Sequence, residues 1–254
     1  MDSVFEDFLR EIDVPDRTLA IVGDEQPEPI RELFQNAFGG LDIDLDTPTI
    51  NTDHEDTVVL LEDGDVVTTS SIETLRNAVL LVNSDLYMSG LSGIDKYEAP
   101  EVLTQLDEGV YTLRGFPEST KEKLLLIVMS RYIEQRALSV GEGRLDVAFQ
   151  QLSRIEDEYG TKRIYNRLSG MPIDLHLYGI PDSYPDGLGE VTIHTGRSDR
   201  YQNSWFVVFT PPSGHETEAS ALVAVETDRN VWRSRWTYSF ERVDSIRRRI
   251  VDRF

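Results

Sequence analysis

The sequence predicts an α+β protein. We expect a C-terminal domain with a mixed sheet of four to five strands and packing helices, and a smaller N-terminal α/β region with a β-hairpin. Apolar runs of strand length recur through the second half of the chain, separated by turns that contain proline or glycine, and longer segments have helical spacing. We place the N-terminal region, of unknown role, at residues 1–115 and the C-terminal domain at 116–254.

The N-terminal region begins with apolar residues at helical spacing, which predict an amphipathic helix that includes Phe5 and Leu9. Its clearest element is a hairpin with strands at 57–61 and 66–69, joined by a turn at Asp63-Gly64. The other expected elements are a strand at 18–22, a helix at 27–38 and an acidic linker or long loop at 39–56.

Three predicted helices begin with a serine that is followed three residues later by a glutamate. In this spacing each side chain satisfies a free backbone donor at the start of the helix. The pairs are Ser70/Glu73, Ser119/Glu122 and Ser153/Glu156. The second of these helices (120–138) is apolar on all sides over 124–129, which predicts burial. Burial in the core of the chain is favoured over a subunit contact in a homodimer.

The C-terminal domain is predicted to contain one strand–helix–strand unit followed by successive strands. The strands are expected at 144–149, 173–178, 191–195, 204–210 and 219–226, and the helices at 153–168 and 240–253. Residues 205–209 are all apolar, so their strand should be central and covered on both faces. In the strand at 173–178, Asp174, His176 and Tyr178 share one polar face.

Composition indicates the cellular environment. The chain has 46 acidic and 25 basic residues, a formal charge of −21, and only four of the basic residues are lysine. At molar salt the Debye length is about 3 Å, so like charges hardly repel, and hydrated carboxylates keep a protein soluble. We therefore expect a halophilic source, a haloarchaeon. The acidic balance also argues against a nucleic-acid partner, which needs a basic face.

The sequence contains no cysteine, which excludes disulfides, cysteine-bound metals and thiol catalysis. No apolar run approaches the roughly 18 residues of a membrane span, and the acidic start is unlike a signal peptide. We expect a cytoplasmic protein without a membrane partner.

Charge is distributed unevenly along the chain. Residues 1–70 contain 19 acidic and three basic residues, whereas residues 229–254 contain three acidic residues and eight arginines. One interpretation is an acidic halophilic surface with arginines that favour the dipole at the end of a helix. The other is that the basic tail docks an acidic partner, such as the N-terminal region of the same chain. The first interpretation is favoured.

Five short motifs occur in order over residues 117–254. They are Ser130-Arg131-x-Ile133-Glu134, Phe149-Gln150, Tyr165, Leu177-Tyr178-Gly179-x-Pro181 and Trp232-x-x-x-Trp236-Thr237-Tyr238. Together they resemble the DICT domain, a sensory module of diguanylate cyclases and two-component systems. Ser234 and Arg235 depart from the glycine and the apolar residue usual in the last motif. Ser239 replaces an aspartate but keeps an N-cap residue for the final helix. The resemblance implies a sensory role with signalling proteins as partners.

Trp232 and Trp236 have two interpretations. They either anchor the final helix on the sheet, which is favoured, or line a ligand pocket. In the second interpretation the ligand-binding residues are Arg131, Phe149, Gln150, Tyr178, Trp232 and Trp236. A planar organic ligand or chromophore would suit these aromatic walls. The sequence leaves the cofactor unknown.

The sequence offers no catalytic arrangement. It has no phosphate-binding loop with a Gly-Lys-Ser/Thr end and no Gly-x-Ser-x-Gly elbow. His176, His194 and Asp174 would meet if their strands were neighbours, but a solvated sheet face is favoured over a metal site. We expect a non-catalytic signal-transduction protein that senses a small molecule, a chromophore or a cellular cue. The alternative is a protein–protein adaptor or regulator of a two-component or other signalling pathway that binds no small ligand.

Overall fold

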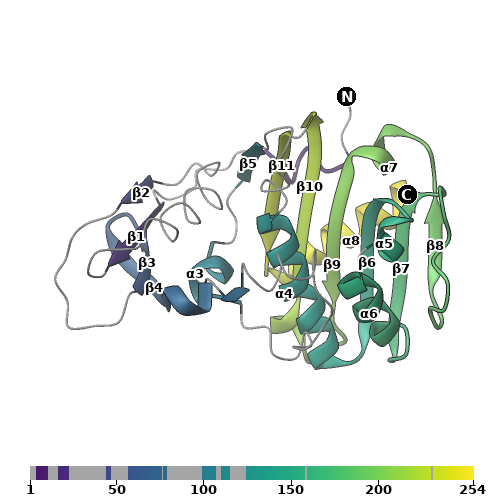
Figure 1. Ribbon diagram of the computed structural model, residues 1–254, viewed down its shortest axis with the longest axis horizontal. Coiled ribbons are helices and arrows are strands. Elements are labelled where there is room, and N and C mark those ends of the chain that lie inside the picture. Colours follow the sequence, from purple (N-terminus) through teal and green to yellow (C-terminus); the bar gives the residue numbers. More distant parts are fainter. Residues whose placement is uncertain are drawn as a thin grey trace.

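The structure is a computed structural model, and it describes residues 4–10, 17–22, 44–46, 57–75, 77–78, 99–106, 110–114, 124–157, 159–229 and 231–254. The described chain contains two sheets (Figure 1). The expected class, mixed sheet plus helices with an N-terminal hairpin, is confirmed. The predicted helix at 27–38 and the predicted cap pair Ser119/Glu122 lie outside the described residues.

The larger sheet has seven strands in the order β5-β11-β10-β9-β6-β7-β8, which is more than the four to five expected. The strands are β5 (Val110–Arg114), β6 (Gly143–Gln151), β7 (Ile173–Ile180), β8 (Thr192–Thr195), β9 (Ser204–Thr210), β10 (Ser220–Asp228) and β11 (Val231–Thr237). Strands β6, β7 and β8 pair in parallel, and the other pairs are antiparallel. The apolar strand β9 lies between β10 and β6, as predicted.

Helices cover both faces of the larger sheet (Figure 1). Helix α4 (Leu124–Val140) packs against β9 and β10 on one face, and α6 (Tyr159–Leu168) packs against α4. Helix α8 (Phe240–Arg253) packs against β9 and β10 on the other face, and α7 (Asp199–Asn203) contacts β6 and β7. Two shorter helices are α5 (Arg154–Asp157), which packs against α6, and the 3-10 helix η3 (Glu216–Glu218), which contacts α4.

Alternation along the central strands sorts their side chains between two hydrophobic clusters. Val207 and Phe209 of β9 lie in the cluster under α4, whereas Phe206 and Val208 lie in the cluster under α8. All four side chains are buried. A strand that is apolar at every position is stable only where both faces of the sheet are covered, and β9 occupies such a place.

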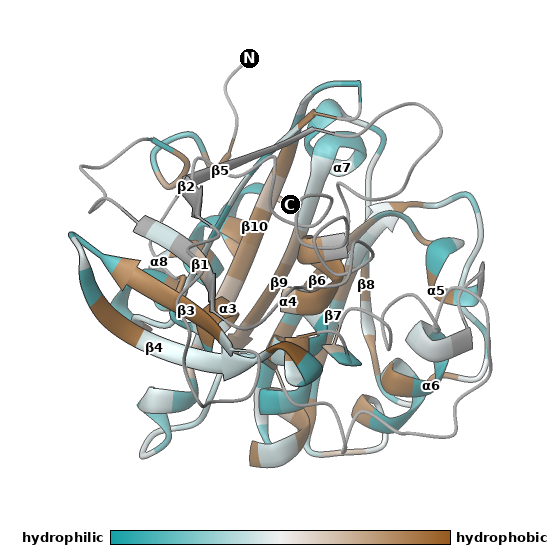
Figure 2. Ribbon diagram, turned by 60° about the vertical axis from the view of Figure 1, so that its left-hand side comes forward, coloured by the Kyte–Doolittle hydropathy of each residue, from teal (hydrophilic) through white to brown (hydrophobic). Residues whose placement is uncertain are grey.

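The smaller sheet has the order β2-β1-β3-β4. Its strands are β1 (Arg17–Val22), β2 (Asp44–Asp46), β3 (Thr57–Glu62) and β4 (Asp65–Ser71), and α3 (Glu101–Thr104) contacts β3 and β4. The β3–β4 hairpin confirms the predicted one, while β2 forms inside the segment expected to be a linker. The apolar residues of β3 and α3 (Figure 2) belong to the same buried cluster as those of α4.

The predicted first helix is wrong. Residues 4–10 form turns, with one helical hydrogen bond from the Leu9 amide to the Phe5 carbonyl (2.9 Å). Phe5 and Leu9 are nevertheless buried, as the apolar pattern predicts. Arginine side chains of β11 and α8 donate to the carbonyls of Val4, Phe8 and Leu9. Tertiary contacts therefore replace the hydrogen bonds that a helix would form.

Two of the three predicted serine–glutamate caps, Ser70/Glu73 and Ser153/Glu156, are also wrong in detail. Ser71, and not Ser70, accepts the hydrogen bond from the Thr74 amide (3.0 Å), because the Ser70 hydroxyl accepts the Val102 amide instead. The Ser153 hydroxyl donates to Asp182 (2.6 Å). The long helix that the sequence places after Thr120 is confirmed as α4, and its apolar run is buried within the chain.

Candidate functional site

The residues that the sequence suggested as a ligand pocket lie on both faces of the larger sheet. Trp232 and Trp236 are fully buried in the cluster under α4, and the Trp232 ring meets Trp205 edge to face at 6.2 Å. Tyr178 lies in the cluster under α8. The sheet separates Tyr178 from the two tryptophans, so these three side chains do not share a wall.

Arg131 belongs to a buried polar network between α4 and α6. Its guanidinium donates to Glu134 (2.6 Å) and to the Thr161 hydroxyl (2.6 Å), and the Tyr165 hydroxyl donates to Glu134 (2.6 Å). Burial, followed by the charge of Glu134, raises the pKa of Tyr165 well above its usual value. Phe149 packs edge to face on the Tyr165 ring at 5.1 Å. This network joins the two helices to the end of β6.

Gln150 lies at an irregularity where β6 leaves its register with β7, and its φ of 62° is in the left-handed region. Its amide nitrogen donates to the Gln202 carbonyl (2.6 Å), and its amide oxygen accepts from Arg154. Gln150 therefore ties β6 to α5 and α7. The side chain of Arg131 instead points into the α4–α6 interface through its bonds to Glu134 and Thr161.

The polar face of β6, β7 and β8 carries a second network. Arg144 makes a two-pronged contact with the buried carboxylate of Asp146 (2.7 and 2.9 Å), which also accepts from the Tyr178 hydroxyl (2.9 Å). The hydrogen bond to Asp146 raises the pKa of Arg144. Burial raises the pKa of Tyr178, and the negative charge of Asp146 is the second cause. The carboxylate of Asp146 thus holds both neighbours in their protonated forms.

His176 and His194 meet across β7 and β8, which are neighbours in the sheet. Nδ1 of His176 lies 2.8 Å from Nε2 of His194, and Nε2 of His176 lies 2.9 Å from Asp174. The His194 ring stacks on Tyr178 with 4.3 Å between ring centroids. Burial, followed by the charge of His176, lowers the pKa of His194. Within the part of the chain that the structure describes, no group of three or more His, Cys, Asp or Glu residues could hold a metal ion.

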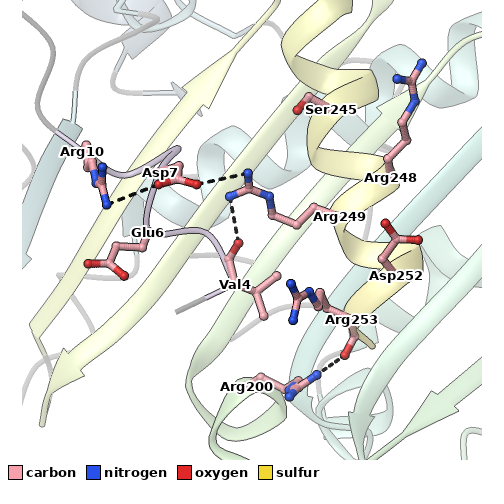
Figure 3. A pocket seen from close by; sticks show the side chains of 10 residues that line it. All are labelled: Val4, Glu6, Asp7, Arg10, Arg200, Ser245, Arg248, Arg249, Asp252 and Arg253. Atoms are coloured by element: carbon pink, nitrogen blue, oxygen red, sulfur yellow. Dashed lines mark hydrogen bonds and ion pairs between the residues drawn. The ribbon is translucent and has the colours of Figure 1, made fainter. Parts of the chain in front are cut away.

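A pocket of about 710 Å³ lies between residues 4–10, α7 and the second half of α8 (Figure 3). We call it the arginine pocket, because five of its ten lining residues are arginine. Its lining consists of Val4, Glu6, Asp7, Arg10, Arg200, Ser245, Arg248, Arg249, Asp252 and Arg253. It is lined by charged side chains almost throughout, unlike the aromatic pocket that the sequence suggested.

Residues 4–10, the N-terminal segment, are held against α8 and β11 by arginines. Arg249 donates to the Val4 carbonyl (3.2 Å) and contacts the Asp7 carboxylate (3.3 Å), as Figure 3 shows. Arg235 is 2% exposed, donates to the Phe8 carbonyl (2.9 Å) and lies over the Phe8 ring. The arginine-rich C-terminal part of the chain therefore docks the N-terminal segment of the same chain.

Comparison with known proteins decides the family. The sequence model of the DICT family, described as a sensory domain in diguanylate cyclases and two-component systems, matches residues 100–227, half of the chain. The chain belongs to the DICT family. No curated protein and no solved structure matches it.

The match places most of the larger sheet inside the DICT domain and leaves several elements outside it. The matched residues 100–227 include β5 to β9, α4 to α7 and nearly all of β10. Trp232, Trp236 and α8 follow the matched residues, and the N-terminal segment precedes them. The arginine pocket is therefore formed mainly by elements that flank the matched region, with Arg200 as its one lining residue inside the match.

Sequence reasoning missed the arginine pocket in this DICT protein. Arg200 and the N-terminal segment are separated from α8 in the sequence, so no motif joins them. The excess of arginine over residues 229–254, against the acidic first 70 residues, was the one signal available. The less favoured of its two interpretations, that the basic tail docks the N-terminal region, agrees with these contacts, but neither interpretation predicts a cavity. Among the described residues, no helix is long and apolar enough to span a membrane.

Proposed function

We propose that this DICT protein is a non-catalytic sensor in signal transduction that binds a small molecule in the arginine pocket. The observation that carries the proposal is the pocket itself. Its volume of about 710 Å³ is within the range of small-molecule sites in proteins, roughly 300–1,000 Å³. Membership of a sensory family supports a sensory role for it. The acidic composition fits a cytoplasm at molar salt.

The position of the pocket suits a sensor. One wall is the N-terminal segment, which leads along the chain towards the smaller sheet that begins with β1. The opposite wall is α8, which packs on the larger sheet. A ligand that contacts both walls would change how firmly the segment is held. Such a change would pass to the N-terminal region without any chemical reaction.

The polar clusters of the larger sheet support a role without catalysis. The Arg131–Glu134 pair and the Arg144–Asp146 pair form hydrogen bonds with neighbouring side chains and join elements of the fold. Neither pair lines the arginine pocket. We therefore assign both to stability, and we assign the pocket to binding.

Native mass spectrometry of protein made in a halophilic host and purified at high salt would test the sensory proposal. We expect a bound small molecule, and we expect addition of that molecule to raise the melting temperature by mass action. Purified protein that carries no small molecule, and whose melting temperature no metabolite mixture changes, would contradict the proposal.

A second candidate function is a protein–protein adaptor, as the sequence allowed. The observation that favours it is the edge strand β4, where Val66 is 62% exposed and Val67 is 43% exposed. The outer edge of β4 pairs with none of the described strands, and apolar residues at such an edge are a common place for strand addition by a partner or a second copy. Light scattering would detect a homodimer, and affinity purification would detect a complex with a partner. Val66→Lys should abolish the complex that is detected. If the complex survives Val66→Lys, β4 is not its interface.

Two features of the sequence that would suit an adaptor, the apolar run of α4 and the arginine-rich C-terminal part, form contacts inside the chain. The apolar run of α4 is buried in the core. Arg233, Arg235 and Arg249 are bound to the N-terminal segment. A ligand sensor therefore has the stronger structural support.

A further inference from the structure

We propose that the ligand of the arginine pocket is a compact polyanion, a small molecule with two or more phosphate or carboxylate groups. The inference rests on the sensory function proposed above and names the chemical class of its ligand. It departs from the planar organic ligand that the aromatic residues of the sequence suggested.

The charge of the pocket is opposite to that of the whole chain. Five arginines and three carboxylates line it, whereas the chain carries 46 acidic and 25 basic residues. At molar salt the Debye length is about 3 Å, so a bound ligand would respond to the charges of the pocket and hardly to the distant acidic surface. The pocket is therefore a local site for an anion on an acidic protein.

Some of the arginines that line the pocket form ion pairs with residues of the chain, and Arg253 forms none within its described part. Arg249 and Arg10 contact Asp7, and Arg248 pairs with Asp244 on its own helix. The guanidinium of Arg253 forms no hydrogen bond or ion pair with any residue that the structure describes. In Figure 3 the Arg253 side chain leaves α8 on the side of Val4, towards the interior of the pocket. Arg253 is thus available for an external anion.

The residues that line the pocket suit an anion better than a planar aromatic ligand. Val4 is the one apolar residue among those that line the pocket, and none of them is aromatic. A flat ring would find no aromatic side chain to stack on there, only charged guanidinium groups. Guanidinium groups instead bind phosphate and carboxylate through two parallel hydrogen bonds. A volume of about 710 Å³ exceeds the needs of one small anion, so a molecule with several charged groups fits best.

Contacts with α7 and β9 hold the backbone at the end of α8, which carries Arg253. Arg200 of α7 donates to the backbone carbonyl of Arg253, and Tyr201 donates to the carbonyl of Phe254. The Phe254 ring packs edge to face against Phe206 at 5.3 Å. These contacts fix the last turn of α8, so the side chain of Arg253 starts from an ordered backbone. An ordered backbone lowers the entropy cost of binding.

Isothermal titration calorimetry with inorganic pyrophosphate would test the assignment, with citrate in a second series and KCl of equal ionic strength as the blank. The titrations use the full chain at the lowest KCl concentration that leaves its melting curve unchanged. We expect saturable binding of one probe molecule per chain. Arg253→Gln should weaken it by about threefold to tenfold, and Arg200→Gln/Arg253→Gln should weaken it further. Arg242→Gln, the same charge change on α8 outside the pocket, should leave it unchanged.

A variant that should bind the probe more tightly separates an effect on binding from damage to the fold. Asp252 lines the pocket from α8, and Asp252→Asn removes a repulsive carboxylate without removing a donor. We expect it to tighten binding of the probe by about twofold to fivefold. A damaged fold would not produce this gain.

Three outcomes would overturn the anion assignment. They are absence of binding by both probes, an equal loss with Arg242→Gln and Arg253→Gln, and no gain with Asp252→Asn. A preference for pyrophosphate over citrate would support a phosphorylated ligand, and the reverse would support a polycarboxylate. If native mass spectrometry finds an uncharged ligand and neither probe binds, the sensory function stands and the anion assignment falls.

Discussion

Arg131 and Glu134 form a buried ion pair whose two members depend on each other. Their side chains are 8% and 2% exposed, and the distance between the charged atoms is 2.6 Å. Removal of one member of a buried pair leaves a charge without its counter-ion, which costs about 3–5 kcal/mol. Glu134→Ala should therefore lower the free energy of unfolding by about this amount in a denaturant titration.

Glu142→Ala is the matched control for this prediction, because Glu142 is exposed just after α4. We expect its effect on the free energy of unfolding to stay within about 0.5 kcal/mol. If Glu134→Ala cost no more than Glu142→Ala, the pair would contribute nothing to stability.

His194 should make the stability of the protein depend on pH. Burial and the adjacent His176 lower the pKa of His194 below its ordinary 6.5 in the folded protein. In the unfolded chain His194 binds a proton as the pH falls through about 6.5, while the folded protein binds it only at lower pH. The free energy of unfolding is therefore highest above this value and falls as the pH drops towards the lowered pKa.

His194→Gln removes this titration. Melting temperatures at about pH 7.5 and about pH 5 should differ less in the variant than in the unchanged protein. The same pH dependence in both proteins would show that other groups, such as the carboxylates on the same face, cause it.

The sequence indicates which residues can form a pair better than it indicates whether that pair is buried and which residues enclose it. The three-residue spacing of Arg131 and Glu134 fits a contact on one helix face, which is typical of a surface pair, whereas the structure buries the pair. Thr161 and Tyr165 enclose the pair, and they lie about 30 positions further along the chain. The meeting of His176 and His194 could be predicted only on the condition that β7 and β8 are neighbours. Burial depends on tertiary neighbours, which a local pattern does not contain.

At the scale of elements, the N-terminal segment behaves as part of the core. Phe5 is fully buried, and its ring meets Phe206 edge to face at 5.7 Å. Phe5→Ala should therefore destabilise the protein like a change inside a core helix, by about 3–5 kcal/mol. Chemical denaturation measures this loss directly.

Phe240→Ala makes the same chemical change where the side chain is 37% exposed, at the start of α8. We expect it to cost clearly less than Phe5→Ala, about 1 kcal/mol. Equal losses would mean that the segment does not contribute to the core as its burial implies.

Two strands of the larger sheet could not be predicted from local patterns. In β11, Trp232 and Trp236 face α4, while Arg233 and Arg235 face the N-terminal segment. An alternation of tryptophan with arginine suggests a solvent-exposed face, because arginine is seldom buried. Here the backbone carbonyls of Leu9 and Phe8 accept hydrogen bonds from Arg233 and Arg235. Strand β5 forms by pairing with β11, which lies more than 100 residues away. By contrast, α8 has the bounds expected from its apolar spacing.

At the scale of the whole molecule, one hydrophobic core extends across the boundary predicted near residue 115. The cluster contains Val58 and Leu60 of the smaller sheet together with Leu126 of α4 and Trp232 of the larger sheet. Two sheets that share a buried cluster exclude water together, and each loses apolar contacts if the other unfolds. Cooperative unfolding of both sheets follows from this arrangement.

Leu60→Ala tests this cooperativity from the smaller sheet. All three tryptophans, Trp205, Trp232 and Trp236, lie in the larger sheet, so their fluorescence reports mainly on that sheet. Leu60 is fully buried, and its truncation should cost about 2–5 kcal/mol. If the sheets unfold together, the fluorescence transition of the variant moves to lower denaturant and coincides with the transition in circular dichroism. If they unfold separately, the fluorescence midpoint shifts less than the circular dichroism curve, and the two transitions no longer coincide.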